Sequence, residues 1–111
     1  MEHKIEDRGI ALLISFAGDI DLQTSPGARK ALLGCSGKGK AVLVDLGGVG
    51  YIDSSGIASL VECLQAVKKS GHGMALVSVS EGARRVLQLA RLDKVFTICG
   101  TVDEGLAAVG N

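Results

Sequence analysis

Residues 41–69 read AVLVDLGGVGYIDSSGIASLVECLQAVKK, and this stretch decides the fold of the chain. It opens with a continuous apolar run at residues 41–44, closed by Asp45 and Leu46, and such a run predicts a buried strand. It ends in an amphipathic helix, because apolar residues recur at helical spacing at Ile57, Leu60, Val61, Leu64 and Val67. We expect any chemistry of this protein at the junction between the two.

That junction reads Asp53-Ser54-Ser55-Gly56. The first N–H groups of a helix have no partner inside the helix, and the side chain of Ser55, or of Asp53 in another register, could cap them. We favour Ser55 as the cap, which leaves the Ser54 hydroxyl pointing outward. The positive end of the helix also suits an anion such as phosphate. The simplest alternative is that these four residues form a helix cap and nothing more.

Strands and helices alternate on both sides of this stretch. The first helix is expected to begin with Ser25 as its cap and Pro26 at its first position, and to give way to a loop over residues 34–40. Ser80 is expected to cap a later helix, and the last helix covers residues 102–109. The expected strands are residues 1–6, 10–17, 41–46, 74–79 and 95–99. This order predicts one α/β domain over residues 1–111, with a mixed sheet of four or five strands and helices mainly on one face.

Composition excludes several classes of partner. Lysine and arginine total 12, as do aspartate and glutamate, so no charge excess favours nucleic acid. Aromatic residues are only 3% of the chain, which leaves few platforms for stacking bases. No apolar run approaches the ~20 residues of a membrane-spanning helix, and no signal peptide opens the chain. We therefore expect a cytoplasmic protein without membrane insertion.

The residues also argue against a metal, a cofactor or an active site. Cys35, Cys63 and Cys99 are far apart and are interpreted as reduced, and neither His3 nor His72 has a companion at metal-ligand spacing. A serine nucleophile needs a base within reach, and the positions of the histidines do not suggest one near Ser54. The glycines match neither a phosphate-binding loop nor a dinucleotide fingerprint. We predict a binding protein and not an enzyme.

The order and lengths of the elements, together with two short motifs, resemble the STAS domain, and within that family the stand-alone bacterial anti-sigma factor antagonists. One motif is the apolar strand followed by residues 51–56, YIDSSG, and then the apolar helix. The other is residues 18–21, GDID, which is similar to the Gly-Glu-Leu-Asp of the family. Residues 47–50, GGVG, contain more glycine than the usual family loop, which suggests a mobile approach to the site.

The resemblance implies a phosphorylation-switched module. The family's phosphoacceptor corresponds to Ser54, and the acidic loop beside it corresponds to Asp19 and Asp21. The implied partners are an anti-sigma factor with serine kinase activity and a serine phosphatase. The expected surroundings of the site and partner-binding residues are Asp19, Asp21, Asp53, Ser55, Gly56 and Ile57. Two other roles stay open: an accessory subunit of a lipid-transport ABC system, and a scaffold in stress signalling.

Overall fold

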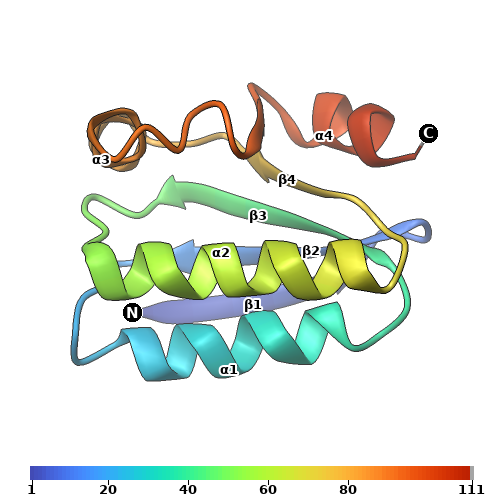
Figure 1. Cartoon of the computed structure of the whole chain (residues 1–111), viewed down its shortest axis with the longest axis horizontal. Helices are drawn as coiled ribbons and strands as arrows, with labels where there is room; N and C mark the ends of the chain where they lie inside the picture. The colour runs from blue at the N-terminus through green and yellow to red at the C-terminus, as the bar shows by residue number, and fades with distance from the viewer. Residues whose placement is uncertain (111) are drawn as a thin grey trace.

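Five strands form one mixed sheet in a computed structural model that describes residues 1–110. The strands stand in sequence order across the sheet, with β3 in the centre (Figure 1). β1 pairs antiparallel with β2, and all later neighbours pair in parallel. The bounds are β1 (Glu2–Asp7), β2 (Ala11–Ala17), β3 (Ala41–Gly48), β4 (Met74–Val77) and β5 (Thr97–Cys99). The predicted mixed sheet with a central third strand is confirmed.

Four helices cover the sheet, and three of them share one face. They are α1 (Ser25–Ser36), α2 (Ser54–Lys69), α3 (Glu81–Leu89) and α4 (Val102–Val109). Buried residues of α1, α2 and α3 belong to the larger of two core clusters, whereas α4 packs on the smaller cluster behind the sheet. The helices therefore lie mainly on one face, as the sequence predicts.

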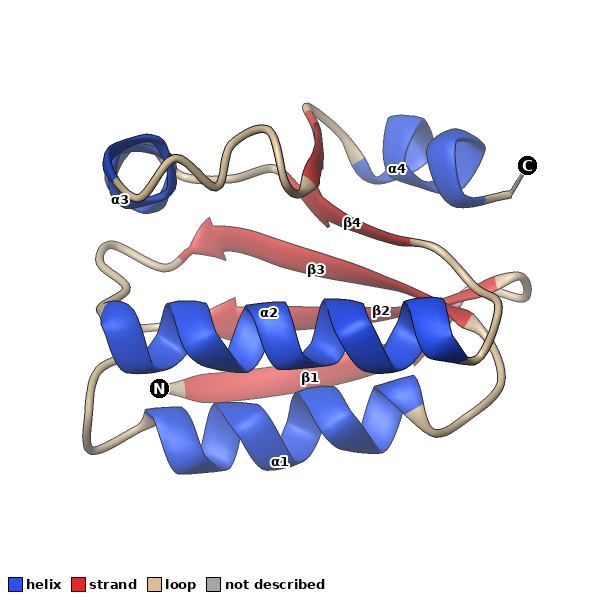
Figure 2. Ribbon diagram, viewed as in Figure 1, coloured by secondary structure: helices blue, strands red, loops and turns tan. Residues whose placement is uncertain are grey.

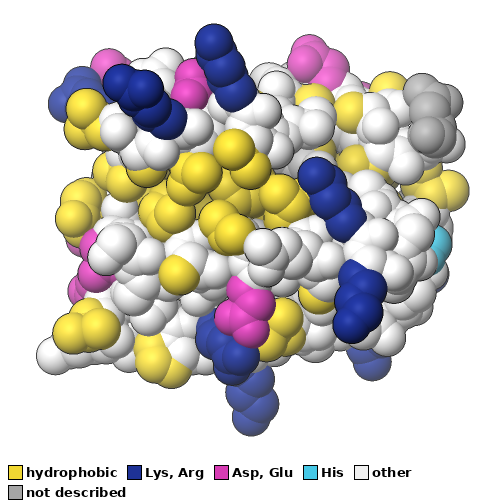
Figure 3. Space-filling view, viewed as in Figure 1, with side chains coloured by type: hydrophobic (Ala, Val, Ile, Leu, Met, Phe, Trp, Pro, Cys, Tyr) yellow, Lys and Arg dark blue, Asp and Glu magenta, His cyan; other side chains and the backbone are white. Residues whose placement is uncertain are grey.

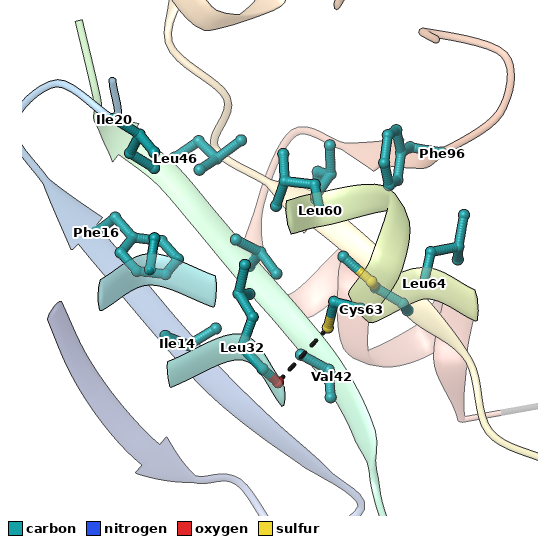
Figure 4. Packing of buried hydrophobic residues seen from close by; sticks show 14 of the residues in the cluster. Ile14, Phe16, Ile20, Leu32, Val42, Leu46, Leu60, Cys63, Leu64 and Phe96 are labelled. Atoms are coloured by element: carbon teal, nitrogen blue, oxygen red, sulfur yellow. Dashed lines mark hydrogen bonds between the residues drawn. The ribbon is translucent and has the colours of Figure 1, made fainter. Parts of the chain in front are cut away.

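The larger core explains why α1 and α2 lie side by side. Leu32 of α1 and Leu60 of α2 are almost completely buried, and both point toward the β3 side chains (Figure 4). Cys63 fills the space between the two helices, and its Sγ lies 3.7 Å from the Leu32 carbonyl oxygen. Burial raises the pKa of the Cys63 thiol to about 12, with a smaller contribution from Cys35, so this cysteine is a packing residue.

Several predicted boundaries are wrong. The third strand continues to Gly48 instead of ending at Leu46, and the last strand begins at Thr97 instead of Val95. Thr24, not Ser25, is the residue before α1, and it makes no side-chain capping bond. Residues 34–36, expected in a loop, continue the helix to Ser36. The fourth strand ends at Val77 and does not reach Val79, because Ser78 adopts a φ of 52° that takes the chain out of the extended conformation.

Candidate functional site

The site begins with a short parallel bridge between two loops. Ile20 donates its N–H to the Tyr51 carbonyl oxygen at 3.0 Å, and Asp53 donates its N–H to the Ile20 carbonyl oxygen at 3.0 Å. The Ile20 and Ile52 side chains are both buried beneath this bridge. The bridge therefore joins the GDID loop that follows β2 to the YIDSSG segment, two motifs more than thirty residues apart in the sequence.

Asp53 is the residue that caps α2. Its backbone is extended, with φ −96° and ψ −175°, and its Oδ1 accepts the N–H of Ser55 at 2.9 Å and that of Gly56 at 3.2 Å. Ser55, which we favoured as the cap, already lies inside the helix, and its hydroxyl donates to Asp53 Oδ1 at 2.5 Å. The prediction of Ser55 as the cap is wrong, and the register with Asp53 is correct.

These contacts set the charge of the cap. The Ser55 hydroxyl contributes most to a lowered pKa of the Asp53 carboxyl, partial burial opposes it, and backbone N–H groups of Gly56, Ser55 and Leu22 lower the pKa further. Asp53 is therefore a fixed carboxylate at neutral pH. It holds negative charge at the positive end of α2, where the helix dipole stabilises it.

Ser54 differs from Ser55 and Ser59 because its hydroxyl stabilises no part of the described fold. It is the first residue of α2 and is exposed. Within residues 1–110 its hydroxyl makes no hydrogen bond, whereas the hydroxyls of Ser55 and Ser59 are both bonded. Ser54 thus offers a free hydroxyl at the mouth of a helix, as the sequence predicts.

Gly56 and Ile57 form the floor of the site rather than its surface. Both are buried, although the sequence analysis placed them among the expected partner-binding residues. A Cβ on Gly56 would come within 2.6 Å of the Ile52 side chain and 2.7 Å of the Ile20 side chain. Only glycine lets α2 start directly on top of the bridge, which fixes the position of Ser54.

The acidic loop contains one structural and one exposed carboxylate. Asp21 Oδ1 accepts the N–H groups of Gln23 at 3.0 Å and Thr24 at 3.1 Å, and also the Thr24 hydroxyl at 3.2 Å. Asp21 therefore shapes the turn into α1. Asp19 is exposed and lies against Gly50, because a Cβ on that glycine would be 3.3 Å from Asp19 Oδ1. Asp19 carries the accessible negative charge.

The start of α3 supports the other side of the site. Ser80 caps α3 by accepting the Ala83 N–H at 3.1 Å, and its hydroxyl donates to the Val49 carbonyl oxygen. Gly82 packs directly against the Gly50 carbonyl, where a Cβ would clash. These contacts and the complete burial of Val49 pack residues 47–50 against the start of α3. The sequence analysis, which predicted a mobile approach to the site, did not foresee this packing.

The sequence analysis did not predict the exposed apolar residues around the site. Leu22 is 76% exposed and Tyr51 is 51% exposed, and both lie in the bridged loops. The feature of the sequence that could have revealed them is the presence of a large apolar residue in a loop. Figure 3 also shows hydrophobic side chains gathered on the face between α2 and α3. Partly or well exposed apolar residues of these elements and the turn after α3 include Val61, Val86, Leu89, Leu92 and Val95.

All these parts meet at one end of the sheet. Figure 2 shows the arrowheads of β2 and β3 at the same end as the start of α2. Among residues 1–110, no group of three or more histidine, cysteine, aspartate or glutamate side chains could hold a metal ion. None of the described helices is long and apolar enough to span a membrane. The arrangement combines the exposed, unbonded hydroxyl of Ser54, the carboxylates of Asp19 and Asp53, and an apolar surface.

Comparisons with known proteins agree on one family. The family model of the STAS domain matches residues 3–105. The anti-sigma-B factor antagonist of Bacillus subtilis (strain 168) is 28% identical over 93 residues, which cover 84% of this chain and 85% of the relative.

Two solved structures of relatives share the fold. An anti-sigma factor antagonist from Mycobacterium paratuberculosis superposes with a TM-score of 0.89 at 28% identity, over 99% of this chain and 94% of the other. An anti-sigma-factor antagonist (STAS) domain protein from Planctomyces limnophilus gives 0.84 at 26% identity, over 98% of each chain.

Proposed function

This chain belongs to the STAS domain family, and on that premise we propose that it is an anti-sigma factor antagonist switched by phosphorylation of Ser54. In its unmodified form it binds an anti-sigma factor in the cytoplasm and so releases the sigma factor for transcription. The anti-sigma factor is also the serine kinase that modifies it. This chain is the substrate of that kinase and has no catalytic role.

The observation that carries this proposal is the contrast between Ser54 and its neighbours. The hydroxyl of Ser55 is used to hold Asp53, and that of Ser59 donates to the Ser55 carbonyl oxygen at 3.1 Å. Ser54 alone of the three is both exposed and unbonded within the described chain. A kinase can therefore modify Ser54 without first breaking a contact that supports the fold.

The reaction needs little from this chain. The Ser54 Oγ attacks the γ-phosphorus of ATP, ADP leaves, and a base of the kinase takes the hydroxyl proton. The lowered pKa of Asp53 keeps that neighbouring carboxyl ionised and makes it a hydrogen-bond acceptor. Its role is to position the start of α2, since its Oδ1 is already engaged by Ser55 and Gly56.

Phosphate changes the surface and leaves the fold as it is. The group adds about −1.5 to −2 charge at neutral pH, next to the Asp53 carboxylate and the acidic loop of Asp19. A partner that buries a neutral hydroxyl must now bury a dianion. Mispairing a buried charge in an interface weakens binding by roughly 30-fold to several thousand-fold. The partner therefore dissociates, and a serine phosphatase restores binding by hydrolysing the stable phosphoserine ester.

Intact-mass measurement tests the proposal directly. The protein is incubated with ATP and each candidate anti-sigma kinase of its host, and phosphopeptide mapping then locates the modification. We expect one phosphoryl group, on Ser54. The Ser54→Ala variant should take up no phosphate and should bind the kinase nearly as tightly as the wild type, which calorimetry can measure.

Two matched variants make the result decisive. Ser55→Ala should still be phosphorylated, because it keeps the acceptor and loses only the bond to Asp53. Ser54→Asp should bind more weakly than the wild type, but less weakly than the phosphoprotein, because it adds one charge instead of nearly two. Phosphate found on Ser55, or a Ser54→Asp protein that binds the kinase as tightly as wild type, would overturn the assignment.

A further inference from the structure

A groove of about 480 Å³ lies between α1 and the edge strand β1, on a part of the molecule that the proposed function does not use. Its floor and walls are apolar and include Ile5, Leu12, Ala31 and Cys35. Every residue of β1 is exposed, and Ile5 is 47% exposed even though it faces the helix side of the sheet. The volume falls in the range of sites for small molecules, which are mostly apolar with a few polar groups.

The groove owes part of its depth to a glycine that the fold does not require. Gly34 lies inside α1, where glycine destabilises a helix relative to alanine. A Cβ at Gly34 would meet no atom within 4 Å, in contrast to Gly56, whose Cβ would clash. Gly34 lines the groove. The missing side chain therefore leaves open space at a cost to the helix, and packing within the chain does not explain it.

Two ammonium groups stand at this groove without a counter-charge. Lys30 and Lys38 line it, and no aspartate or glutamate does so among residues 1–110. Neighbouring basic residues are paired: Arg29 with Glu62 at 2.7 Å, and Lys40 with Asp7 at 2.8 Å. Neither Lys30 nor Lys38 has an ion pair in the described chain. The groove thus combines an apolar bed with free positive charge.

We propose that this groove binds a single-chain anionic amphiphile, a long-chain carboxylate. The alkyl chain lies on the apolar floor of the groove, in the space over Gly34, and the carboxylate pairs with the ammonium groups that line the groove, those of Lys30 and Lys38. An alkyl chain needs no hydrogen bond, so it fits the apolar walls of the groove. The carboxylate provides the negative partner that Lys30 and Lys38 do not have within the described chain.

Other occupants fit the surroundings less well. An added peptide strand would have to pair with β1, whose sequence EHKIED carries the alternating charges that protect sheet edges from such pairing. A flat membrane surface would not reach the floor of a groove that lies between a helix and a strand. A free chain that enters the groove avoids both difficulties.

Titration with dodecanoate, kept below its micelle concentration and followed by amide NMR, tests this site. We expect saturable shifts at Ile5 and Gly34, and little change at Ser54. Decanoate should bind about four- to fifteenfold more weakly, because each methylene removed from a buried chain weakens binding by roughly two- to fourfold. Dodecyltrimethylammonium, with the same chain and the opposite charge, should bind more weakly than dodecanoate.

Two variants and a matched control locate the ligand. Gly34→Leu fills the groove and should weaken dodecanoate binding by about tenfold or more. The double variant Lys30→Glu/Lys38→Glu should lose a similar factor and should reverse the preference between the two head groups. Lys68→Glu/Lys69→Glu makes the same change of charge on α2, outside the groove, and should bind as the wild type does.

Each contrary outcome overturns the inference. Binding that ignores chain length, or that survives the Lys30/Lys38 reversal, would exclude this site. Binding to anionic vesicles without binding of free dodecanoate would make the groove a membrane contact instead. If Gly34→Leu fails to fold, the lysine pair decides. Because the readout involves neither the kinase nor Ser54, its failure would leave the proposed antagonist function untouched.

Discussion

The helices α2 and α3 start at the same end of the sheet, each after a parallel strand, and they use serine in opposite ways. At α3 the cap is Ser80, whose hydroxyl both accepts the Ala83 N–H and donates to the Val49 carbonyl. At α2 the cap is the Asp53 carboxylate, and the first helical residue, Ser54, keeps its hydroxyl free. In α3 the serine is the cap itself, whereas in α2 it follows the cap by one position, and the Ser54 hydroxyl is left without a hydrogen bond in the described chain.

This contrast explains how the proposed phosphorylation of Ser54 would be compatible with a stable helix. Because Asp53 satisfies the first N–H groups of α2, Ser54 can gain a phosphate without uncapping the helix. The same modification at Ser80 would remove a cap and break the bond to the loop over residues 47–50. The Asp53 carboxylate thus stabilises the start of α2, next to the residue that we propose is phosphorylated.

The largest effects on stability should come from buried leucines within α2 and α3, because both helices pack on the core in the same way. Leu64→Ala in α2 and Leu87→Ala in α3 remove buried side chains, and each should cost about 2–5 kcal/mol of unfolding free energy. Leu89→Ala is the matched control, because Leu89 is 79% exposed, and it should stay within about 0.5 kcal/mol of wild type. Urea unfolding measures all three. A wild-type midpoint for Leu64→Ala would show that the α2 face is misassigned.

A smaller effect should come from the contact that joins the two helix starts. Gly82→Ala forces a Cβ against the Gly50 carbonyl, and a backbone atom cannot move aside as a side-chain end can. We expect a loss of about 1–3 kcal/mol, with amide NMR shifts that spread from α3 to residues 47–50. Gly34→Ala, at a helix position with open space, should instead be neutral or stabilising. Equal stabilities of the two variants would refute the proposed contact.

The two caps should respond differently to pH. Ser80→Ala should cost about 0.5–2 kcal/mol at every pH, because its hydroxyl does not titrate. Asp53 has a lower pKa in the folded chain than in the unfolded one, so its contribution is complete above the unfolded pKa of about 3.9 and disappears as the pH falls through the folded value. Asp53→Asn should therefore flatten stability below pH ~4. Thermal melts from pH 2 to 7 would reveal an unchanged acid dependence if the cap were misassigned.

The smallest effect should be at Ser54 itself. Ser54→Ala removes an exposed, unbonded hydroxyl and should change stability by less than about 0.5 kcal/mol. Ser55→Ala should raise the pKa of Asp53, because the Ser55 hydroxyl is the main reason that this pKa is low. Carboxyl NMR titration separates the two variants. An Asp53 pKa that moved with Ser54 and not with Ser55 would reverse their roles.

The local sequence pattern was sufficient to predict one of the two helix caps at this site, but not the other. Ser80 was predicted correctly as a cap, because it directly precedes the helix and Glu81 follows it in the first turn. Asp53 and Ser55 both fit as caps of α2, and the choice depends on the bridge between Ile20 and Ile52, which fixes where the chain stops being extended. That bridge joins distant segments, so local sequence could not reveal it.

The fold was easier to predict than the surface, for the same reason. The apolar run of β3 and the periodic stripe of α2 each report burial within one segment. The exposure of Tyr51 and Leu22 depends on what other segments leave uncovered. The groove beside β1 likewise depends on where α1 lies over the sheet, which no single stretch encodes.

The strand order of the sheet has a consequence for synthesis of the chain. Each strand pairs only with its predecessor and successor in the sequence, so no strand has to insert between two that are already in place. As the polypeptide leaves the ribosome, the β1–β2 hairpin can form first, and each later strand can then add to a finished edge. Domains emerge N-terminal part first, and short-range pairing favours rapid folding. The chain can thus assemble in the order in which it is translated, and the two segments that the bridge joins, residues 18–21 and 51–56, are both made before its last two strands.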